Sequence, residues 1–198
     1  MKTFVTVAIC VALAAATAHA GTITDPASGA LKLKLLVNAD KSCYLVNVSA
    51  ATLSWDGYQI ISDSNILDPT RNEGADTGWK SIADYLANGE YTLVGNTLGS
   101  GAFSSGEANP TTHQVAEVNQ SASSSQAAGA QWYIGKAVSV MPPTTSAVPS
   151  PASGLQFYYS MPGTVGSDFL GMIEVVPEPA SIVLLVLGGV GLLVRKRR

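Results

Sequence analysis

The stretch Leu31-Lys32-Leu33-Lys34-Leu35 indicates the fold class of this chain, because apolar and charged residues alternate along it. Strict alternation is typical of a half-buried β-strand, whose successive side chains point to opposite faces of a sheet. A polar turn at 38–42 follows, and then the apolar run 44–48. The two runs and the turn between them predict a β-hairpin.

Similar strand patterns recur along the chain. Further strands are predicted at residues 58–61, 91–94, 114–118, 132–140, 155–159 and 170–176. Residues 132–140 are apolar enough for a central strand. One short helix is predicted over 79–86, where Trp79 and Ile82 share a face at helical spacing and Asn88-Gly89 marks the end.

About eight short strands, one short helix and many Gly, Ser and Asn turns predict an all-β domain. The preferred prediction is an antiparallel β-sandwich of jelly-roll or Greek-key type, and the second choice is a small closed barrel. The Ser/Ala/Gln-rich stretch 121–130 is predicted to be a flexible loop. The Pro-rich stretch 142–153 is predicted to be an extended, solvated connection between strands.

The N-terminus predicts a signal peptide over residues 1–20. Lys2 supplies a positive start, residues 4–16 are apolar, and Ala18 and Ala20 frame a small-residue cleavage site. We expect the mature chain to begin at Gly21. This prediction implies the Sec translocon and signal peptidase as partners.

The C-terminus has three adjoining parts: Pro177-Glu178-Pro179, an apolar run that begins at Ala180 and ends at Val194, and Arg195-Lys196-Arg197-Arg198. The apolar run predicts a transmembrane helix of about 22 Å, which is short against a hydrocarbon core of about 30 Å. The basic cluster is expected to stay cytoplasmic. The two prolines keep Glu178 extended, since neither continues a helix.

This combination resembles a PEP-CTERM sorting signal over residues 177–198. The resemblance implies recognition by an exosortase, a membrane-embedded enzyme of exopolysaccharide-producing bacteria that cuts near the Pro-Glu-Pro. The product would move from the inner membrane to the cell envelope, surface or extracellular matrix. We therefore expect a signal peptide at 1–20, an exported domain at 21–176 and a sorting signal at 177–198.

Charge and cysteine usage narrow the role of the exported part. Six basic and fourteen acidic residues lie between 21 and 178, a net charge of −8. This excess of acids argues against nucleic acid as a partner, because phosphates need clustered Lys and Arg. Cys43, the single cysteine of this part, is predicted to be a buried small hydrophobe.

No catalytic constellation stands out, so we expect a non-enzymatic protein. His113 is the single histidine after the signal peptide, and no Gly-x-Ser-x-Gly motif surrounds a serine. The sequence does not single out a pair of carboxylates for glycoside hydrolysis, because many pairs of acidic residues could meet in a fold. No cofactor is predicted, apart from calcium as a candidate.

Two sets of side chains are candidate binding residues. Asp63, Asp68 and Asp76 offer hard oxygen ligands for Ca²⁺, although a solvated loop with Asx turns explains the same residues. Trp55, Tyr58 and Trp79 stand near acids and are candidate glycan contacts, although such aromatics also form cores.

Three functions therefore stay open. The first is an exported surface or matrix protein that an exosortase sorts and that associates with exopolysaccharide. The second is a carbohydrate-binding or glycan-active β-sandwich. The third is an uncleaved, tail-anchored envelope protein.

Overall fold

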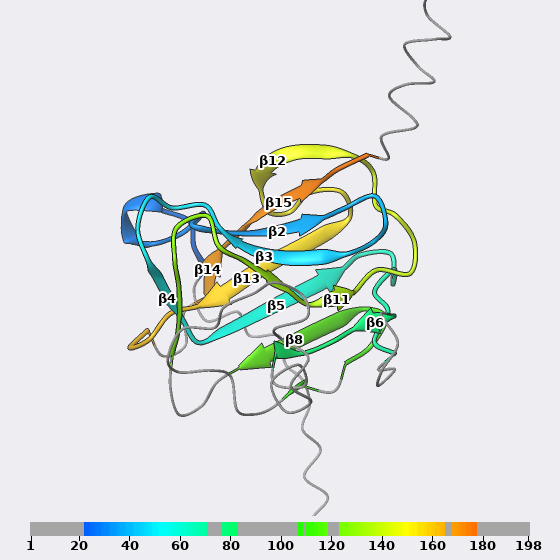
Figure 1. Cartoon of the computed structure of the whole chain (residues 1–198), viewed down its shortest axis with the longest axis horizontal. Coiled ribbons are helices and arrows are strands. Elements are labelled where there is room, and N and C mark those ends of the chain that lie inside the picture. The colour runs from blue at the N-terminus through cyan, green and yellow to red at the C-terminus, as the bar shows by residue number, and fades with distance from the viewer. Residues whose placement is uncertain are drawn as a thin grey trace, which may run out of the picture.

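The computed structural model describes residues 22–70, 77–82, 107–108, 110–118, 123–164 and 168–177. These residues form mostly β-structure, arranged in two main sheets (Figure 1). The predicted all-β class is confirmed. The predicted signal peptide and the predicted transmembrane helix lie outside the described residues.

The six-stranded sheet has the order β1-β14-β13-β5-β8-β7. Its strands are β1 (Thr22–Ile23), β14 (Asp168–Leu170), β13 (Leu155–Ser160), β5 (Gly57–Ser62), β8 (Gln114–Val118) and β7 (Glu107–Ala108). The five-stranded sheet has the order β10-β3-β2-β15-β12. Its strands are β10 (Gln131–Tyr133), β3 (Cys43–Asn47), β2 (Leu33–Val37), β15 (Met172–Val175) and β12 (Thr145–Pro149).

Three smaller elements complete the description. Strand β4 (Leu53–Trp55) pairs with β9 (Ser124–Gln126), and β6 (Gly78–Trp79) pairs with β11 (Gly135–Lys136). A short 3-10 helix, η1 (Pro26–Ser28), follows β1, and the carboxylate of Asp25 accepts a hydrogen bond from its first turn.

The hairpin predicted from the alternating stretch is confirmed. Strands β2 and β3 pair antiparallel, with Leu35 opposite Leu45 and Val37 opposite Cys43. Alternate residues of β2 are buried, as the period of two requires. The strand begins at Leu33 rather than Leu31, because Leu31 has a φ of 62°, a left-handed conformation that a strand does not accommodate.

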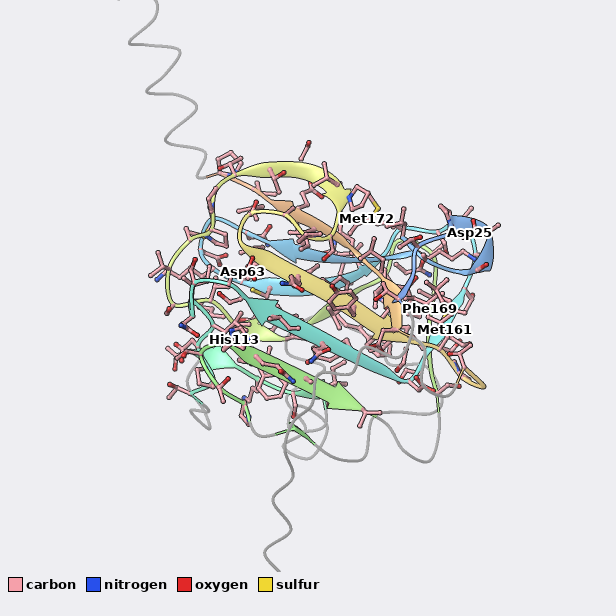
Figure 2. All side chains as sticks on the ribbon, turned by 180° about the vertical axis from the view of Figure 1, so that it is seen from behind. Asp25, Asp63, His113, Met161, Phe169 and Met172 are labelled. Atoms are coloured by element: carbon pink, nitrogen blue, oxygen red, sulfur yellow. The ribbon has the colours of Figure 1, made fainter. Side chains whose placement is uncertain are left out.

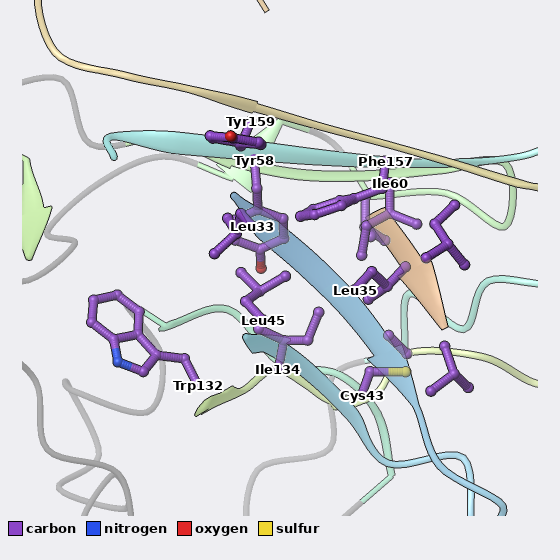
Figure 3. Packing of buried hydrophobic residues seen from close by; sticks show 14 of the residues in the cluster. Leu33, Leu35, Cys43, Leu45, Tyr58, Ile60, Trp132, Ile134, Phe157 and Tyr159 are labelled. Atoms are coloured by element: carbon purple, nitrogen blue, oxygen red, sulfur yellow. The ribbon is translucent and has the colours of Figure 1, made fainter. Parts of the chain in front are cut away.

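The core lies between the two sheets. Leu33 and Leu35 of β2 face Tyr58, Ile60 and Phe157 of the opposite sheet (Figure 3). All five side chains are at most 3% exposed. Fully burying one such apolar side chain contributes about 1.5–3 kcal/mol relative to leaving it exposed, so contact between the sheets is a main source of stability.

Gly171 carries the chain from one sheet to the other. It separates β14 in the six-stranded sheet from β15 in the five-stranded sheet. A Cβ atom at this position would lie 2.2 Å from Cδ1 of Phe157, far inside van der Waals contact. The single strand predicted at 170–176 is therefore two strands, because the backbone bends where only glycine fits against the Phe157 ring.

The sheets are mixed, which corrects the prediction of a purely antiparallel sandwich. Strand β15 runs parallel to β2, and β1 runs parallel to β14. More than 130 residues separate β2 from β15 in the chain. A hairpin turn imposes an antiparallel direction only on strands that follow each other closely, so it does not constrain this pair. The described strands form two main sheets rather than the small closed barrel considered second.

The central strand predicted at 132–140 is also wrong. This stretch divides into β10, β11 and an isolated bridge between Val138 and Leu67, and β10 lies at a sheet edge. Gly135 has a φ of +83°, and a Cβ there would lie 2.3 Å from the carbonyl oxygen of Gly78. This close approach bends the backbone and interrupts the strand.

The predicted start of the helix at Trp79 is wrong. Trp79 lies in β6, paired with Gly135, and Ile82 has helical conformation. Residues 83–86 lie outside the described residues, as does the strand predicted at 91–94. Neighbouring strands decide the conformation of Trp79, which helical spacing alone did not predict.

Both low-complexity stretches contain strands. Strand β9 lies within 121–130, where a flexible loop was predicted, and Gln126 in it is buried. Strand β12 lies within 142–153 and pairs with β15 at the edge of its sheet. Side chains of β12 are mostly exposed, so the predicted contact with solvent is confirmed although the stretch is not a plain connection.

The core holds two groups whose ionisation is suppressed. Cys43 is buried, as predicted, and burial raises the pKa of its thiol to about 12. Burial likewise raises the pKa of the Tyr159 hydroxyl to about 12. That hydroxyl donates a hydrogen bond to the carbonyl oxygen of Gly29 and accepts one from the Lys32 N–H at 3.2 Å.

We expect the free energy of unfolding to fall as the pH rises from about 9 towards about 12. In this range the unfolded chain loses protons from Cys43 and Tyr159 that the folded chain keeps, so alkali favours unfolding. Urea titrations at several pH values measure the slope. The double variant Cys43→Ala, Tyr159→Phe should show a shallower slope; an unchanged slope would contradict this assignment.

Candidate functional site

The last strand, β15, runs directly towards the C-terminal segment. Val175 is its final residue, is buried, and pairs with Val37 of β2 and with Thr145 of β12. The N–H of Val176 donates a hydrogen bond to the carbonyl oxygen of Val37 at 2.9 Å. The folded domain therefore holds the backbone up to Val176, and half-buried Pro177 follows at once.

An ion pair across two neighbouring strands supports this last strand. The Lys34 ammonium of β2 donates to the Glu174 carboxylate of β15. Both side chains are partly exposed, so the contribution to stability is that of a surface pair, at most about 1 kcal/mol. The pair reinforces the parallel register of β2 and β15 close to the end of the domain.

The turn at 38–42 lies at the same end of the sheet. The Asn38 N–H donates to the Ser42 carbonyl oxygen at 2.9 Å, and Asp40 Oδ1 accepts from the hydroxyl of Ser42 at 2.6 Å. This hydroxyl lowers the pKa of the Asp40 carboxyl below its ordinary value. Lys41 Nζ donates to the carbonyl oxygen of Ser139, which ties the turn to the segment that leads into β12.

The three aromatic residues predicted to contact glycans lie in the core. Trp55, Tyr58 and Trp79 are at most 3% exposed. The indole N–H of Trp79 donates to the Tyr58 hydroxyl at 3.0 Å, and the Trp55 and Tyr58 rings meet edge to face. The structure brings these residues together, but as interior packing. They do not form the exposed aromatic surface that a sugar would contact.

Gln126 is a structural residue that the sequence analysis missed. Its side chain accepts from the Trp55 indole N–H at 3.0 Å and donates to the carbonyl oxygens of Leu45 and Ala130. A buried amide so bonded joins β4, β9 and the hairpin. Its place in a Ser/Ala/Gln-rich stretch concealed this role, since composition alone says nothing of a distant partner.

The candidate calcium ligands do not meet as a set among the described residues. Asp63 Oδ1 accepts from the Gln156 amide at 2.9 Å, and Asp68 Oδ1 accepts from the Thr70 N–H in an Asx turn. Asp76 lies outside the described residues. Within the described part of the chain, no three His, Cys, Asp or Glu residues gather at metal-binding distance. Calcium binding stays a prediction.

A concavity opens on the face of the six-stranded sheet that points away from the core. Its volume is about 200 Å³, and Gln59, Ala116, Ser160 and Asp168 are among its lining residues. Gly57 also lines it, and a Cβ at this position would lie 2.7 Å from Oγ of Ser160. Of the residues predicted to contact glycans, Tyr58 is among those that line this concavity. The other lining residues had no motif in the sequence, since they come from four separate strands.

Tyr158 gives the concavity its aromatic wall. Its hydroxyl donates to Oε1 of Gln156 at 3.2 Å. Burial raises the pKa of this hydroxyl, and the negative charges of Asp168 and Asp63 add to the effect. The lining of the concavity also includes the Gln59 amide and the Asp168 carboxylate. Amide and carboxylate groups beside an aromatic ring are suited to hydroxylated ligands.

His113 lies apart from this concavity. It is exposed in the loop that precedes β8, and its carbonyl oxygen accepts from the Ser62 N–H at 2.8 Å, close to Asp63 (Figure 2). Its own N–H donates to Thr111 Oγ1. These contacts organise the loop.

Comparison with known proteins identifies the C-terminal segment. Residues 175–198 match the family model of the PEP-CTERM protein-sorting motif. The chain carries a PEP-CTERM sorting motif. The motif implies export, sorting at a membrane and an exosortase as the sorting partner. Neither the curated proteins nor the solved structures include a match to this chain.

The structure describes only the beginning of the matched segment. Val175, Val176 and Pro177 are described, whereas Glu178, Pro179 and the apolar run lie beyond them. Among the residues from Thr22 to Pro177 that the structure describes, no helix is long and apolar enough to cross a membrane. The predicted cleavage residues Ala18, Ala20 and Gly21 also lie outside the described part.

Proposed function

We propose that this protein is a non-enzymatic component of the cell surface or extracellular matrix, delivered there as a folded β-domain. An exosortase recognises Pro177-Glu178-Pro179 and removes the segment that follows, and the released domain associates with exopolysaccharide. The PEP-CTERM motif supports the sorting step. The location in the matrix and the association with polysaccharide are further parts of the proposal, which the motif alone does not include.

One structural observation carries the proposal: the sorting motif begins where the last strand ends. Cleavage near Pro177-Glu178-Pro179 leaves every described strand in the product, including β15 with Val175 in the core. The ion pair between Lys34 and Glu174 also stays in the product. The processed domain therefore keeps its fold, so removal of the tail changes location without unfolding the protein.

Mass spectrometry of the mature C-terminus tests this function. The protein is expressed in a PEP-CTERM-sorting host and in the same host lacking its exosortase. We expect a C-terminus close to Pro177-Glu178-Pro179 in the first strain and the full-length chain in the second. A full-length chain in both strains would instead support the uncleaved, tail-anchored protein.

The concavity on the six-stranded sheet favours a second candidate function, binding of a carbohydrate. An aromatic ring, an amide and a carboxylate line it, and these groups bind sugar hydroxyls and ring faces. We propose Gln59 and Asp168, with the edge of the largely buried Tyr158, as contact residues in place of Trp55 and Trp79.

Binding of the released protein to polysaccharides of the host tests this candidate. Gln59→Ala and Asp168→Ala should each weaken binding about tenfold or more, as expected for the loss of a hydrogen bond to a ligand. Gln114→Ala is a matched control on the same sheet and should bind as the wild type does. Equal affinities for all variants would exclude this concavity as the binding site.

A further inference from the structure

We propose that, before processing, one end of the β-domain lies directly on the membrane surface. This exit end consists of the turn 38–42 and the segment 139–144, which flank the end of β15, and its contact is with lipid headgroups through Val140. The proposal rests on the proposed function, since it requires that the apolar run after Pro179 enters the membrane. It adds an orientation and a lipid contact surface.

The short connection between the domain and the predicted membrane segment limits how far the domain can lie from the membrane. Val176 is the last residue hydrogen-bonded to the sheet, and the apolar run begins at Ala180. Four residue steps span at most about 14 Å when fully extended. The headgroup region on each side of a bilayer is itself about 5–8 Å thick. The domain therefore has little room to stand clear of the headgroups.

The pairing of β15 determines which end faces the membrane. Val175 lies beside Val37 on one side and beside Thr145 on the other. The turn 38–42 follows Val37, and the segment 139–144 precedes Thr145. The bond from Lys41 Nζ to the Ser139 carbonyl oxygen joins the two segments. In Figure 1 the chain leaves the domain beside this hairpin turn and the start of β12.

The chemistry of the exit end suits a lipid surface. Val140 is 60% exposed, which exceeds the exposure of Val118 (41%) and Val48 (40%), the other exposed large hydrophobics among the described residues. The two charged residues of this end, Asp40 and Lys41, have opposite signs. One valine binds a membrane weakly, but the adjoining apolar run makes the contact intramolecular, so a weak contact suffices.

Fluorescence quenching by lipids tests this placement in the chain from Gly21 to Arg198, the form expected after removal of the signal peptide. This protein, in which Cys43 is the single native cysteine, is reconstituted in vesicles of phosphatidylethanolamine and phosphatidylglycerol that contain headgroup-labelled quencher lipid. A fluorophore is attached at Val140→Cys or, as the matched control, at Ala128→Cys. Ala128 is exposed at the other end of β3, where the Gly129 N–H bonds to Asn47, while native Cys43 is buried.

We expect the fluorophore at position 140 to be quenched several-fold more than the one at position 128. A flexible spacer of about ten Gly and Ser residues between Val176 and Pro177 adds about 18 Å of root-mean-square reach. The spacer should reduce quenching at position 140 to the level at position 128. Equal quenching at both positions without the spacer would overturn the proposal, as would contact that appears only when the exosortase is added.

Processing in cells separates this proposal from the proposed function. If the chain is cleaved near Pro177-Glu178-Pro179 but position 140 is not quenched, the membrane-facing end is wrong and the sorting function stands. If position 140 is quenched and the chain is never cleaved, the contact stands and the processing step is wrong.

Discussion

Replacing Pro177, Glu178 and Pro179 together by alanine should leave the protein at full length in the membrane fraction. We expect the two prolines to keep this segment extended, because each lacks an N–H and fixes φ. Alanine favours helix, so the triple variant allows the helix predicted from Ala180 to extend backwards and withdraws an extended substrate from the enzyme. Cell fractionation and mass spectrometry of the C-terminus measure the loss of the processed form.

Glu174→Gln is the matched control for this experiment. It removes a carboxylate four residues before Glu178, but one that lies in β15 and pairs with Lys34. Losing a partly exposed ion pair costs at most about 1 kcal/mol, so the variant should fold and be processed as the wild type is. Release of the triple variant at the wild-type level would show that the exosortase does not read these three residues.

Phe157→Ala should lower the free energy of unfolding by about 3–5 kcal/mol. The Phe157 ring is fully buried between the sheets and stacks on Tyr159, with ring centroids 6.3 Å apart. A domain of this size has a total stability of about 5–15 kcal/mol, so this loss is a large share. Urea denaturation of the full chain in mild detergent, followed by tryptophan fluorescence, measures it.

Two further variants make this prediction specific. Val48→Ala shortens a valine that is 40% exposed and should change stability by at most about 0.5 kcal/mol. Gly171→Ala alone places a Cβ against the Phe157 ring and should destabilise by about 1–3 kcal/mol. In the Phe157→Ala background that clash disappears, so the cost of Gly171→Ala should shrink. Strict additivity of the two substitutions would contradict this packing.

Strands with strong local patterns were predicted well. The predicted strand 114–118 coincides with β8, and 58–61 and 155–159 each fall within a single observed strand. In these segments the apolar content and the turns on each side already define a strand, and the tertiary structure agrees with them. The buried state of Cys43 followed from the same reasoning, since an apolar run surrounds it.

Predictions failed where a distant partner decides the conformation. Strand β9 exists because it pairs with β4, and Gln126 within it bonds to Trp55, 71 residues away. Strand β12 exists because it covers the edge of β15. Conversely, the apolar stretch 132–140 breaks at Gly135, where the backbone of Gly78 approaches. None of these contacts has a signature in the residues nearby.

The candidate site residues also fall into two groups, those that the sequence predicted and those that only the fold brings together. Sequence alone located Pro177, Glu178 and Pro179, because a proline-framed acid, an apolar run and a basic cluster are contiguous in the chain. It also proposed Trp55 as a sugar contact, which the core excludes by burying its ring. The residues of the concavity come from four strands, so only their assembly brings them together.

The sequence by itself determined that this chain is β-rich and carries a sorting motif at its C-terminus, since period-two alternation and contiguous motifs are local properties. Only the tertiary structure decided that β15 lies parallel to β2 and that the sheet holds the chain as far as Val176. The physical reason is that strand pairing joins residues more than 130 positions apart, and such pairing depends on the whole core. Because of that pairing, the segment matched by the sorting-motif model, residues 175–198, begins at the last residue of β15.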